Sequence, residues 1–378
     1  MRSYNRSALV MTALLGLMGC GSGNEAVAPL SSVTALTEVG RALFFDEALS
    51  QPAGQSCASC HGSATAFADP RGGPTSEGAI QGLFGARNAP TAAYAIFAPT
   101  FHYDKGEGLY VGGLFLDGRA DSLEQQAQGP PLNPIEMHNP DRAAYVAKVA
   151  SQPYAAQLKA LYGQDLFSDV DRAFNAVSAA IAAFERSAEV SPFTSKYDAY
   201  LRGTAALTSQ EKRGLDLFEG RGGCAACHPN RPGDDGLRPL FTDFTYDNLG
   251  VPRNAANPFY TMPVTVNPAG IGFVDIGLAG NAKVIADGRA AENRGRFKVP
   301  TLRNLAKTGP YMHNGVFTTL KEVVAFYNRR DLDSVQFGPP EVPETMNREE
   351  LGDLGLSEEE EDALVAFLKT LTDGYTGP

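Results

Sequence analysis

The apolar positions of this chain recur mostly at the spacing of a helix and rarely alternate as they would along a strand. The stretch 171–189 is rich in alanine and contains neither glycine nor proline. Within it Phe174, Val177, Ile181 and Phe184 lie three or four residues apart, so they share one face of an α-helix. With 40 glycines and 25 prolines elsewhere, the pattern predicts a mainly α fold whose helices are joined by long loops.

Two further helices carry a start signal. Thr208 is followed three residues later by Glu211, and Ser357 by Glu360, which is the spacing of a capping box. The second box leads into a C-terminal helix whose predicted buried face consists of Leu364, Phe367, Leu368 and Leu371.

The chain contains a loose internal duplication. Segments 38–45 (Glu-Val-Gly-Arg-Ala-Leu-Phe-Phe) and 211–218 (Glu-Lys-Arg-Gly-Leu-Asp-Leu-Phe) each precede a pair of cysteines. The 378 residues suffice for two domains of ordinary size. We place the boundary at Ser191-Pro192, which predicts an N-terminal domain over 33–190 and a C-terminal domain over 191–378.

The cysteine pairs lie in the pentapeptides Cys-Ala-Ser-Cys-His (57–61) and Cys-Ala-Ala-Cys-His (224–228). Cys-x-x-Cys-His is the attachment signature of c-type haem. The two thiols bond to the porphyrin, and the adjacent histidine becomes the proximal iron ligand. Half of a zinc site or a redox-active pair are the alternatives for a bare Cys-x-x-Cys. The predicted haem residues are Cys57, Cys60, His61, Cys224, Cys227 and His228.

The fifth cysteine, Cys20, ends a leader-like segment. Arg2 and Arg6 precede an apolar run over 8–19 that is too short to span a bilayer. Leu-Met-Gly-Cys at 17–20 resembles a bacterial lipobox, which predicts a cleaved signal peptide over 1–20 and lipidation of Cys20. Residues 21–32 would form a flexible tether. An ordinary signal peptide, cut a few residues later, is the alternative; either way the chain is expected to be exported.

Charge narrows the choice of partners. The net charge is −11, and no run of Lys and Arg is available to meet phosphates, which argues against nucleic acid. An acidic surface could attract a cationic electron donor, although acidity also keeps an exported protein soluble. Contact with a membrane is expected only through a lipid at Cys20.

Beyond the haem motifs, the chain resembles the bacterial dihaem cytochrome c peroxidases, and within them the branch that includes MauG. The resemblance covers nearly the whole length after residue 32 and implies two cytochrome c-like haem domains. The matching segments are 85–91, 117–119, 125–127, 133–137, 297–304, 310–315 and 320–324.

The resemblance implies that hydrogen peroxide binds at the N-terminal haem, on the face opposite His61. The family's acid/base glutamate falls on Glu136, and Gln126 and Pro130 fall on the remaining distal positions. Such chemistry needs an open coordination position and a group that moves a proton between the peroxide oxygens. Without the family register, Glu136 would be interpreted as a surface carboxylate or a helix N-terminal residue.

Many members of the family carry a histidine that closes this open position until the enzyme is reduced. Here the corresponding loop, 77–82, reads Glu-Gly-Ala-Ile-Gln-Gly. His102 and His138 are the spare histidines of this half, and both lie outside the loop. We therefore predict a five-coordinate N-terminal haem that reacts without prior reduction.

The resemblance makes the C-terminal haem a six-coordinate electron relay. Where ordinary members place methionine as the second ligand, this chain has Tyr327, as MauG does. Phenolate favours ferric iron and should lower the reduction potential. Met312 and, less so, Met262 are rival ligands. Taken alone, Tyr327 would be a core aromatic residue with a partner for its hydroxyl.

One position departs from the family. A tryptophan usually precedes Asp-Gly-Arg between the haems, whereas this chain has Leu116 there and contains no tryptophan. Leucine cannot be oxidised at accessible potentials. Electron transfer would then rely on direct tunnelling, a haem propionate or a nearby tyrosine, and sharing of two oxidising equivalents between the haems is put in question.

The family also implies a calcium ion between the domains. Asn88 would supply its side-chain oxygen, and Thr308 and Pro310 their backbone carbonyls, which are ligands that suit a hard cation. From sequence alone these three residues would be interpreted as turn formers.

Together these features predict an exported dihaem peroxidase, in the periplasm or on the outer membrane or cell surface. It would take electrons from a small redox protein or from an oxidisable protein substrate. The MauG-like function is preferred; an ordinary cytochrome c peroxidase that removes peroxide, and a non-catalytic electron-transfer cytochrome, are the alternatives.

Overall fold

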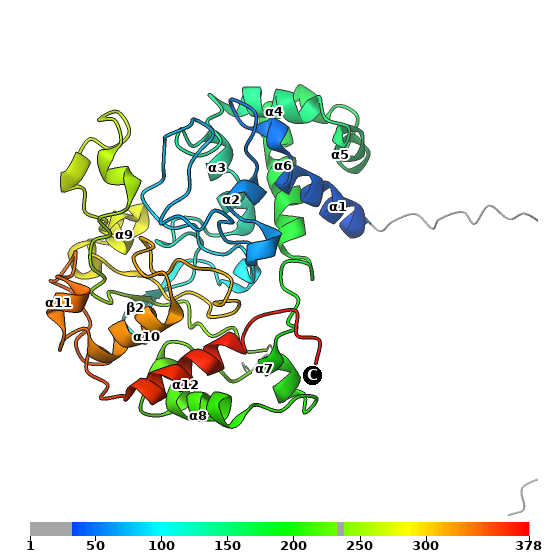
Figure 1. Cartoon of the computed structure of the whole chain (residues 1–378). Coiled ribbons are helices and arrows are strands. Elements are labelled where there is room, and N and C mark those ends of the chain that lie inside the picture. The colour runs from blue at the N-terminus through cyan, green and yellow to red at the C-terminus, as the bar shows by residue number, and fades with distance from the viewer. Residues whose placement is uncertain (1–31, 233–237, 378) are drawn as a thin grey trace, which may run out of the picture.

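The computed structural model describes residues 32–232 and 238–377, in which helices are joined by long loops and sheet is scarce (Figure 1). The structure is 39% helical and therefore mixed, which is less helix than the predicted mainly α fold implies. The predicted leader and Cys20 lie outside the described residues. The α-helices are α1 (Ser32–Phe44), α2 (Leu123–Ala127), α3 (Gly129–Leu132), α4 (Arg142–Ala150), α5 (Ala155–Tyr162), α6 (Val170–Glu185), α7 (Lys196–Leu201), α8 (Ser209–Glu219), α9 (Ala282–Ala286), α10 (Leu320–Arg329), α11 (Ser334–Phe337) and α12 (Glu358–Lys369).

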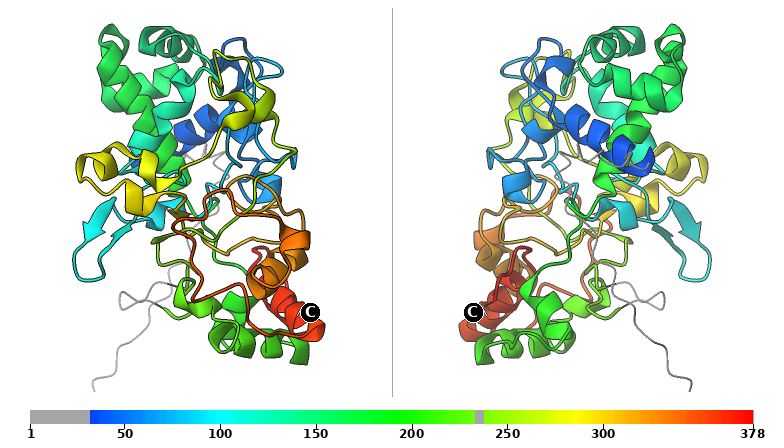
Figure 2. Two further views of the ribbon diagram at one scale, coloured as in Figure 1. Left: turned by 90° about the vertical axis from the view of Figure 1, so that its left-hand side faces the viewer. Right: turned by 90° about the vertical axis from the view of Figure 1, so that its right-hand side faces the viewer.

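Sheet is confined to two antiparallel pairs within the described residues. Strand β1 (His102–Asp104) pairs with β2 (Leu109–Val111), and β3 (Tyr246–Asp247) pairs with β4 (Phe297–Lys298). The first pair is a hairpin that projects from the side of the molecule (cyan in Figure 2). The second pair joins two segments that lie some fifty residues apart in the C-terminal half of the chain.

The predicted capping boxes are present. The Thr208 side chain accepts from the backbone N–H of Glu211, and the Glu211 carboxylate accepts from the N–H of Thr208 at 2.7 Å. Ser357 and Glu360 form the same reciprocal pair at the start of α12. Each box satisfies two N–H groups that the first turn of a helix leaves without a partner.

Two helix pairs form the frame of the molecule (Figure 1). Helix α1 crosses α6 where Gly40 faces Ala180; a Cβ on Gly40 would lie 1.8 Å from the Ala180 carbonyl oxygen. Helix α8 crosses α12 in the same way, and a Cβ on Gly214 would lie 2.0 Å from the carbonyl oxygen of Ala363. Only glycine allows this backbone approach, so the glycine of each duplicated segment fixes a helix crossing.

Each crossing is filled by three phenylalanines in matching positions. In the N-terminal set the rings of Phe44 and Phe184 lie 5.1 Å apart, and Phe67 completes the group. In the C-terminal set Phe218 and Phe367 lie 5.2 Å apart, again with a third ring edge-on. That third ring is Phe241. The duplication seen in the sequence therefore extends to the packing of the cores.

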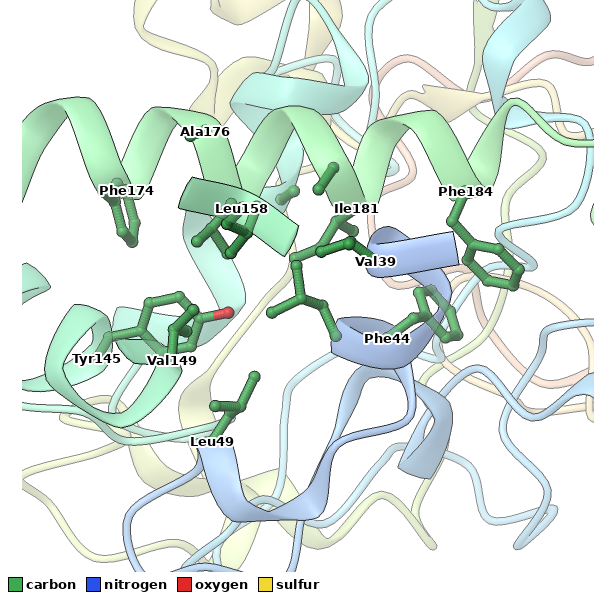
Figure 3. Close-up of a cluster of buried hydrophobic side chains, with 14 of the residues drawn as sticks. Val39, Phe44, Leu49, Tyr145, Val149, Leu158, Phe174, Ala176, Ile181 and Phe184 are labelled. Carbon is green, nitrogen blue, oxygen red and sulfur yellow. The ribbon is translucent and has the colours of Figure 1, made fainter. Parts of the chain in front are cut away.

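The predicted buried faces are buried. On α6, Phe174, Ile181 and Phe184 point toward α1 and α4 (Figure 3). Leu364, Phe367, Leu368 and Leu371 are at most 7% exposed in or just after α12. One core cluster draws on residues 39–190 and another on residues 197–371. The domain boundary at Ser191-Pro192 stays a prediction. No helix among the described residues is long and apolar enough to cross a membrane.

Candidate functional site

Both cysteine pentapeptides line one continuous cavity of about 830 Å³. The family-derived positions lie along the same cavity wall, although they come from loops far apart in sequence. The predicted site residues that line it are Cys57, Cys60, His61, Asn88, Gln126, Pro130, Glu136, Cys224, Cys227, His228, Thr308, Pro310 and Tyr327.

The local structure around His61 orients its imidazole. Nδ1 lies 3.1 Å from the carbonyl oxygen of Phe67. Phe67 has a left-handed backbone (φ 61°), and the Thr91 hydroxyl holds the preceding turn by donating to the Ala66 carbonyl at 2.6 Å. A carbonyl can only accept, so Nδ1 carries the proton and Nε2 is the nitrogen left for a ligand.

The same arrangement recurs at His228. Nδ1 lies 2.7 Å from the carbonyl oxygen of Phe241, which is also left-handed (φ 56°). The Thr301 hydroxyl donates to the carbonyl of Leu240 at 2.6 Å. Burial lowers the pKa of His61 and lowers that of His228 to about 4, so both imidazoles are neutral. A neutral imidazole oriented through Nδ1 is the form that binds a metal through Nε2.

The cysteines do not have the features of a redox pair. All four described cysteines are free, and burial raises the pKa of Cys57, Cys224 and Cys227 to about 12. A thiol–disulfide exchange centre needs a thiol that ionises readily. Among residues 32–232 and 238–377, no three His, Cys, Asp or Glu side chains are grouped so that they could hold a metal ion. Neither alternative to haem attachment gains support.

Glu136 lies in the turn that follows α3, and Pro130 lies within α3 itself. Its backbone N–H donates to the Asn133 carbonyl at 3.1 Å, which fixes the turn. Burial raises the pKa of the Glu136 carboxyl, and the nearby Arg119 opposes this rise. Gln126 reaches the same region from α2, whose first turn is capped by the Ser122 side chain.

The loop at 77–82 packs directly against Glu136. The Ala79 N–H donates to the Glu136 carbonyl at 2.7 Å, and a Cβ on Gly78 would lie 2.3 Å from the Ile135 carbonyl oxygen. The spare histidines are held elsewhere and do not line the cavity. Nδ1 of His102 lies 2.8 Å from the Thr100 carbonyl, and Nδ1 of His138 lies 3.1 Å from that of Gln51.

Tyr327 extends from α10 into the cavity beside the second pentapeptide. Burial is the main cause that raises the pKa of its hydroxyl. Met312 also lines the cavity, so the structure places both candidate ligands there. Met262 does not line it; the sulfur of Met262 accepts a contact from the Phe84 N–H at 3.4 Å.

An ion-pair network joins the N-terminal and C-terminal halves of the chain at the cavity, and we call this contact the junction. Arg87 bonds Asp117 at 2.7 Å and Asp275 at 2.6 Å. Leu116 lines the cavity beside this network, and its carbonyl accepts from the Lys298 N–H at 2.9 Å. The Lys298 ammonium donates to a buried carbonyl at 2.6 Å, and burial lowers its pKa to about 8.

The predicted calcium ligands meet at the same junction. The Asn88 N–H donates to the His313 carbonyl at 2.7 Å, which holds the 88 segment against the 310–313 turn. The Asn88 side-chain nitrogen donates to the Pro74 carbonyl at 3.3 Å. An amide whose nitrogen is used in this way leaves its oxygen for a cation. Thr308 and Pro310 line the cavity nearby, and the calcium ion stays a prediction.

Sequence reasoning did not identify Glu185, which lines the cavity and has a titratable side chain. It follows Ile181 by four residues, so it lies on the face of α6 that the apolar pattern assigns to the core. A carboxylate at a core position was the signal that could have found it. The buried Lys298 and the left-handed Phe67 and Phe241 gave no comparable signal.

The residues present fit two covalently bound haem groups. Each half offers two cysteines and a neutral histidine at one wall of a mostly apolar cavity, and the second half repeats the first atom for atom in its histidine contacts. Fold and site together define a helical c-type haem protein with two haem-binding centres.

Comparison with known proteins agrees with this class of protein and identifies a family within it. Residues 34–206 match the family model described as di-haem cytochrome c peroxidase. The methylamine utilization protein MauG of Paracoccus denitrificans (strain Pd 1222) is 43% identical over 355 residues, which cover 90% of this chain and 89% of that protein. The cytochrome c551 peroxidase of Nitrosomonas europaea is 32% identical and covers 97% of this chain and 89% of its own.

A solved structure agrees with these relatives. The crystal structure of the diheme peroxidase BthA from Burkholderia thailandensis E264 superposes with a TM-score of 0.80 at 36% identity, covering 89% of this chain and 86% of that one. The chain belongs to the dihaem cytochrome c peroxidase family, which includes MauG. It is an enzyme of the haem peroxidase class.

Proposed function

We propose that this enzyme reduces hydrogen peroxide in the N-terminal half of its cavity, with electrons relayed through the C-terminal half. The observation that carries this proposal is that two otherwise matching centres have different side chains lining the cavity around them. In the half that contains His61 lies the carboxyl group of Glu136, whose pKa is raised by burial, and the adjoining loop contains no histidine. Beside His228 lies Tyr327, whose phenol can close the iron's second face.

Glu136 is suited to move the proton that peroxide cleavage requires. The overall reaction, H2O2 + 2 e⁻ + 2 H⁺ → 2 H2O, needs one proton shifted from the near to the far oxygen before the O–O bond breaks. The haem iron would bind the near oxygen and supply the electrons. A carboxylate beside it accepts the proton and, once protonated, donates it to the departing oxygen. Gln126 would orient the peroxide from α2.

Tyr327 would make the second centre an electron relay that peroxide does not enter. As a negatively charged oxygen ligand it would favour the oxidised iron. We prefer it to Met312 because it is the residue that extends from α10, where ordinary family members place their ligand. Burial raises the pKa of its hydroxyl, so ionisation of the phenol would depend on the bound iron, with Arg330 as the cation that lowers this pKa.

The absence of a histidine in loop 77–82 and the presence of Tyr327 favour a MauG-like role, in which peroxide oxidises a protein substrate. Leu116 does not favour this role and leaves the substrate open, so the second candidate is a cytochrome c peroxidase that takes electrons one at a time from a small redox protein. Steady-state assays separate the two. A detoxifying enzyme turns over peroxide with reduced small cytochromes or cupredoxins, whereas a MauG-like enzyme turns over slowly until its protein substrate is added.

We also infer that the two haems occupy separate domains divided near residue 191, and that a calcium ion bound by Asn88, Thr308 and Pro310 bridges them. Export to the periplasm or cell surface, with a lipid on Cys20, completes the proposal. Each of these expectations has its own test. Chelation should weaken the peroxide reaction if calcium is present, and mass spectrometry of the mature N-terminus should find diacylglycerol on Cys20.

Stopped-flow spectroscopy tests the peroxide reaction. The resting ferric holoprotein is mixed with peroxide in the absence of reductant. We expect an immediate spectral change at the N-terminal haem, because its open face needs no prior reduction. A protein that responds only after pre-reduction, or not at all, would contradict the proposal and leave an electron-transfer cytochrome.

A further inference from the structure

Glu185 occupies a position that the internal duplication makes comparable with the second centre. Ala180 of α6 and Ala363 of α12 are equivalent, because each meets the glycine of its helix crossing. Counting five residues onward gives Glu185 in the first centre and Leu368 in the second. Both line the cavity. The first centre therefore has a carboxyl group where the second has an aliphatic side chain.

One oxygen of this carboxyl group has no hydrogen-bond partner in the part of the chain that the structure describes. Glu185 is 5% exposed, and its buried Oε2 has no hydrogen-bond partner among the described residues. A buried ionised carboxylate without a partner is strongly disfavoured. Burial accordingly raises the pKa of Glu185 to about 8, so the group holds a proton at neutral pH.

The charged neighbours of Glu185 do not change its protonation state. Arg186 on the same helix and Glu124 from α2 act on it with opposite signs. These two bond each other at 2.7 Å, so neither neutralises Glu185. On the cavity side, Cys57 is the titratable group that faces it, and its thiol would be consumed by attachment to haem.

We propose that Glu185 holds a proton beside the N-terminal haem and releases it when the iron bound there loses an electron. In balanced form, Fe(II) and the carboxylic acid become Fe(III), a carboxylate, one electron and one proton. The electron passes to the oxidant and the proton to water. The added positive charge on the iron stabilises the carboxylate, which lowers its pKa in the oxidised state. The second centre has Leu368 at the equivalent position and so lacks this particular proton-holding group.

A spectroelectrochemical titration of the holoprotein between about pH 6 and 9 tests the coupling, with the two haems followed separately. One proton lost with one electron shifts the equilibrium tenfold per pH unit, so the N-terminal potential should fall by up to about 59 mV per unit. In Glu185→Gln the slope should vanish over this range. In Glu124→Gln, which removes the neighbouring exposed carboxyl, the slope should persist.

Glu185→Leu gives the first centre the side chain of the second and should also remove the slope, so the test does not depend on one variant. In the wild-type protein, redox-difference infrared spectra should show a carboxylic acid C=O band gained on reduction. A pH-independent wild-type potential, or a slope retained in both Glu185 variants, would overturn the proposal. The proposal rests on haem at this centre but not on peroxide chemistry: a protein inert to peroxide that keeps the slope would refute the proposed function alone.

Discussion

The two halves of the cavity share a frame and differ in what they place around it. Each has a glycine-mediated helix crossing, three phenylalanines and a histidine held through Nδ1 by a left-handed phenylalanine. They differ in the side chains added to this frame: the first half has Glu136 and the second Tyr327, and Glu185 of the first half stands at the position that Leu368 has in the second. A repeated frame can thus fix the cofactor, while these two differences divide the chemical roles.

Among the variants, replacing Glu136 is expected to have the largest effect, because it removes a group that distinguishes the first half from the second. Glu136→Gln keeps the shape of the side chain and removes its acid/base function, which typically contributes about 10²- to 10⁴-fold to the rate. The rate constant for the peroxide reaction should fall by that order, measured by stopped flow. Glu124→Gln, which alters a carboxyl outside the cavity, serves as the control. A loss of less than tenfold in Glu136→Gln would exclude Glu136 as the acid/base group.

Replacing Tyr327 tests the second half. Tyr327→Met exchanges a phenol for a thioether, and a methionine ligand raises haem potentials. The C-terminal potential should rise by a large part of the roughly 0.8 V range that axial ligands span, while the N-terminal potential changes little. Potentiometric titration measures both. If Met312→Leu moves the C-terminal potential and Tyr327→Met does not, Met312 is the ligand.

The pH dependence of the peroxide reaction sharpens the assignment of Glu136. The proton acceptor must be ionised, and burial raises the pKa of Glu136. Activity should therefore increase with pH up to that raised pKa and fall about tenfold per unit below it. The acid limb should disappear in Glu136→Gln. An acid limb that remains unchanged in this variant would assign it to another group.

Because the two halves share the same glycine crossing, we expect a methyl group at either glycine to lower stability to a similar extent. In Gly40→Ala or Gly214→Ala the added methyl group would overlap a backbone carbonyl that cannot move aside. Overpacking of this kind costs about 1–3 kcal/mol, which exceeds the roughly 1 kcal/mol that alanine gains over glycine within a helix. Thermal unfolding should shift downward in both variants. Gly272→Ala, where no atom lies within 4 Å, should leave it unchanged.

The smallest expected effect is at the junction. Leu116→Trp places an oxidisable ring beside the Arg87 network, at the position where relatives have tryptophan. Electron exchange between the two haems should become faster, and peroxide should then produce a spectral change at both haems without added reductant. Transient spectra of the variant and the wild type compare this directly; identical inter-haem kinetics would mean that another route carries the electron.

Much of the frame could be predicted from sequence because it depends on local signals. Thr208 and Ser357 begin their helices, and the apolar face of α6 is buried, because caps and periodicity act over a few residues. The cavity brings together segments separated by nearly 200 residues, such as Glu136 and Tyr327, and here the family register supplied what local patterns could not. Glu185 lies at a core position of the α6 pattern, which the sequence shows, but the sequence does not show that its buried Oε2 lacks a hydrogen-bond partner among the described residues.

The central claim is that one centre has an open face and the other is closed on both sides. Electron paramagnetic resonance of the resting ferric protein tests this most directly. We expect one high-spin signal from the N-terminal haem and one low-spin signal from the C-terminal haem, with the high-spin signal lost when peroxide is added. Two low-spin signals at rest, unchanged by peroxide, would contradict the account.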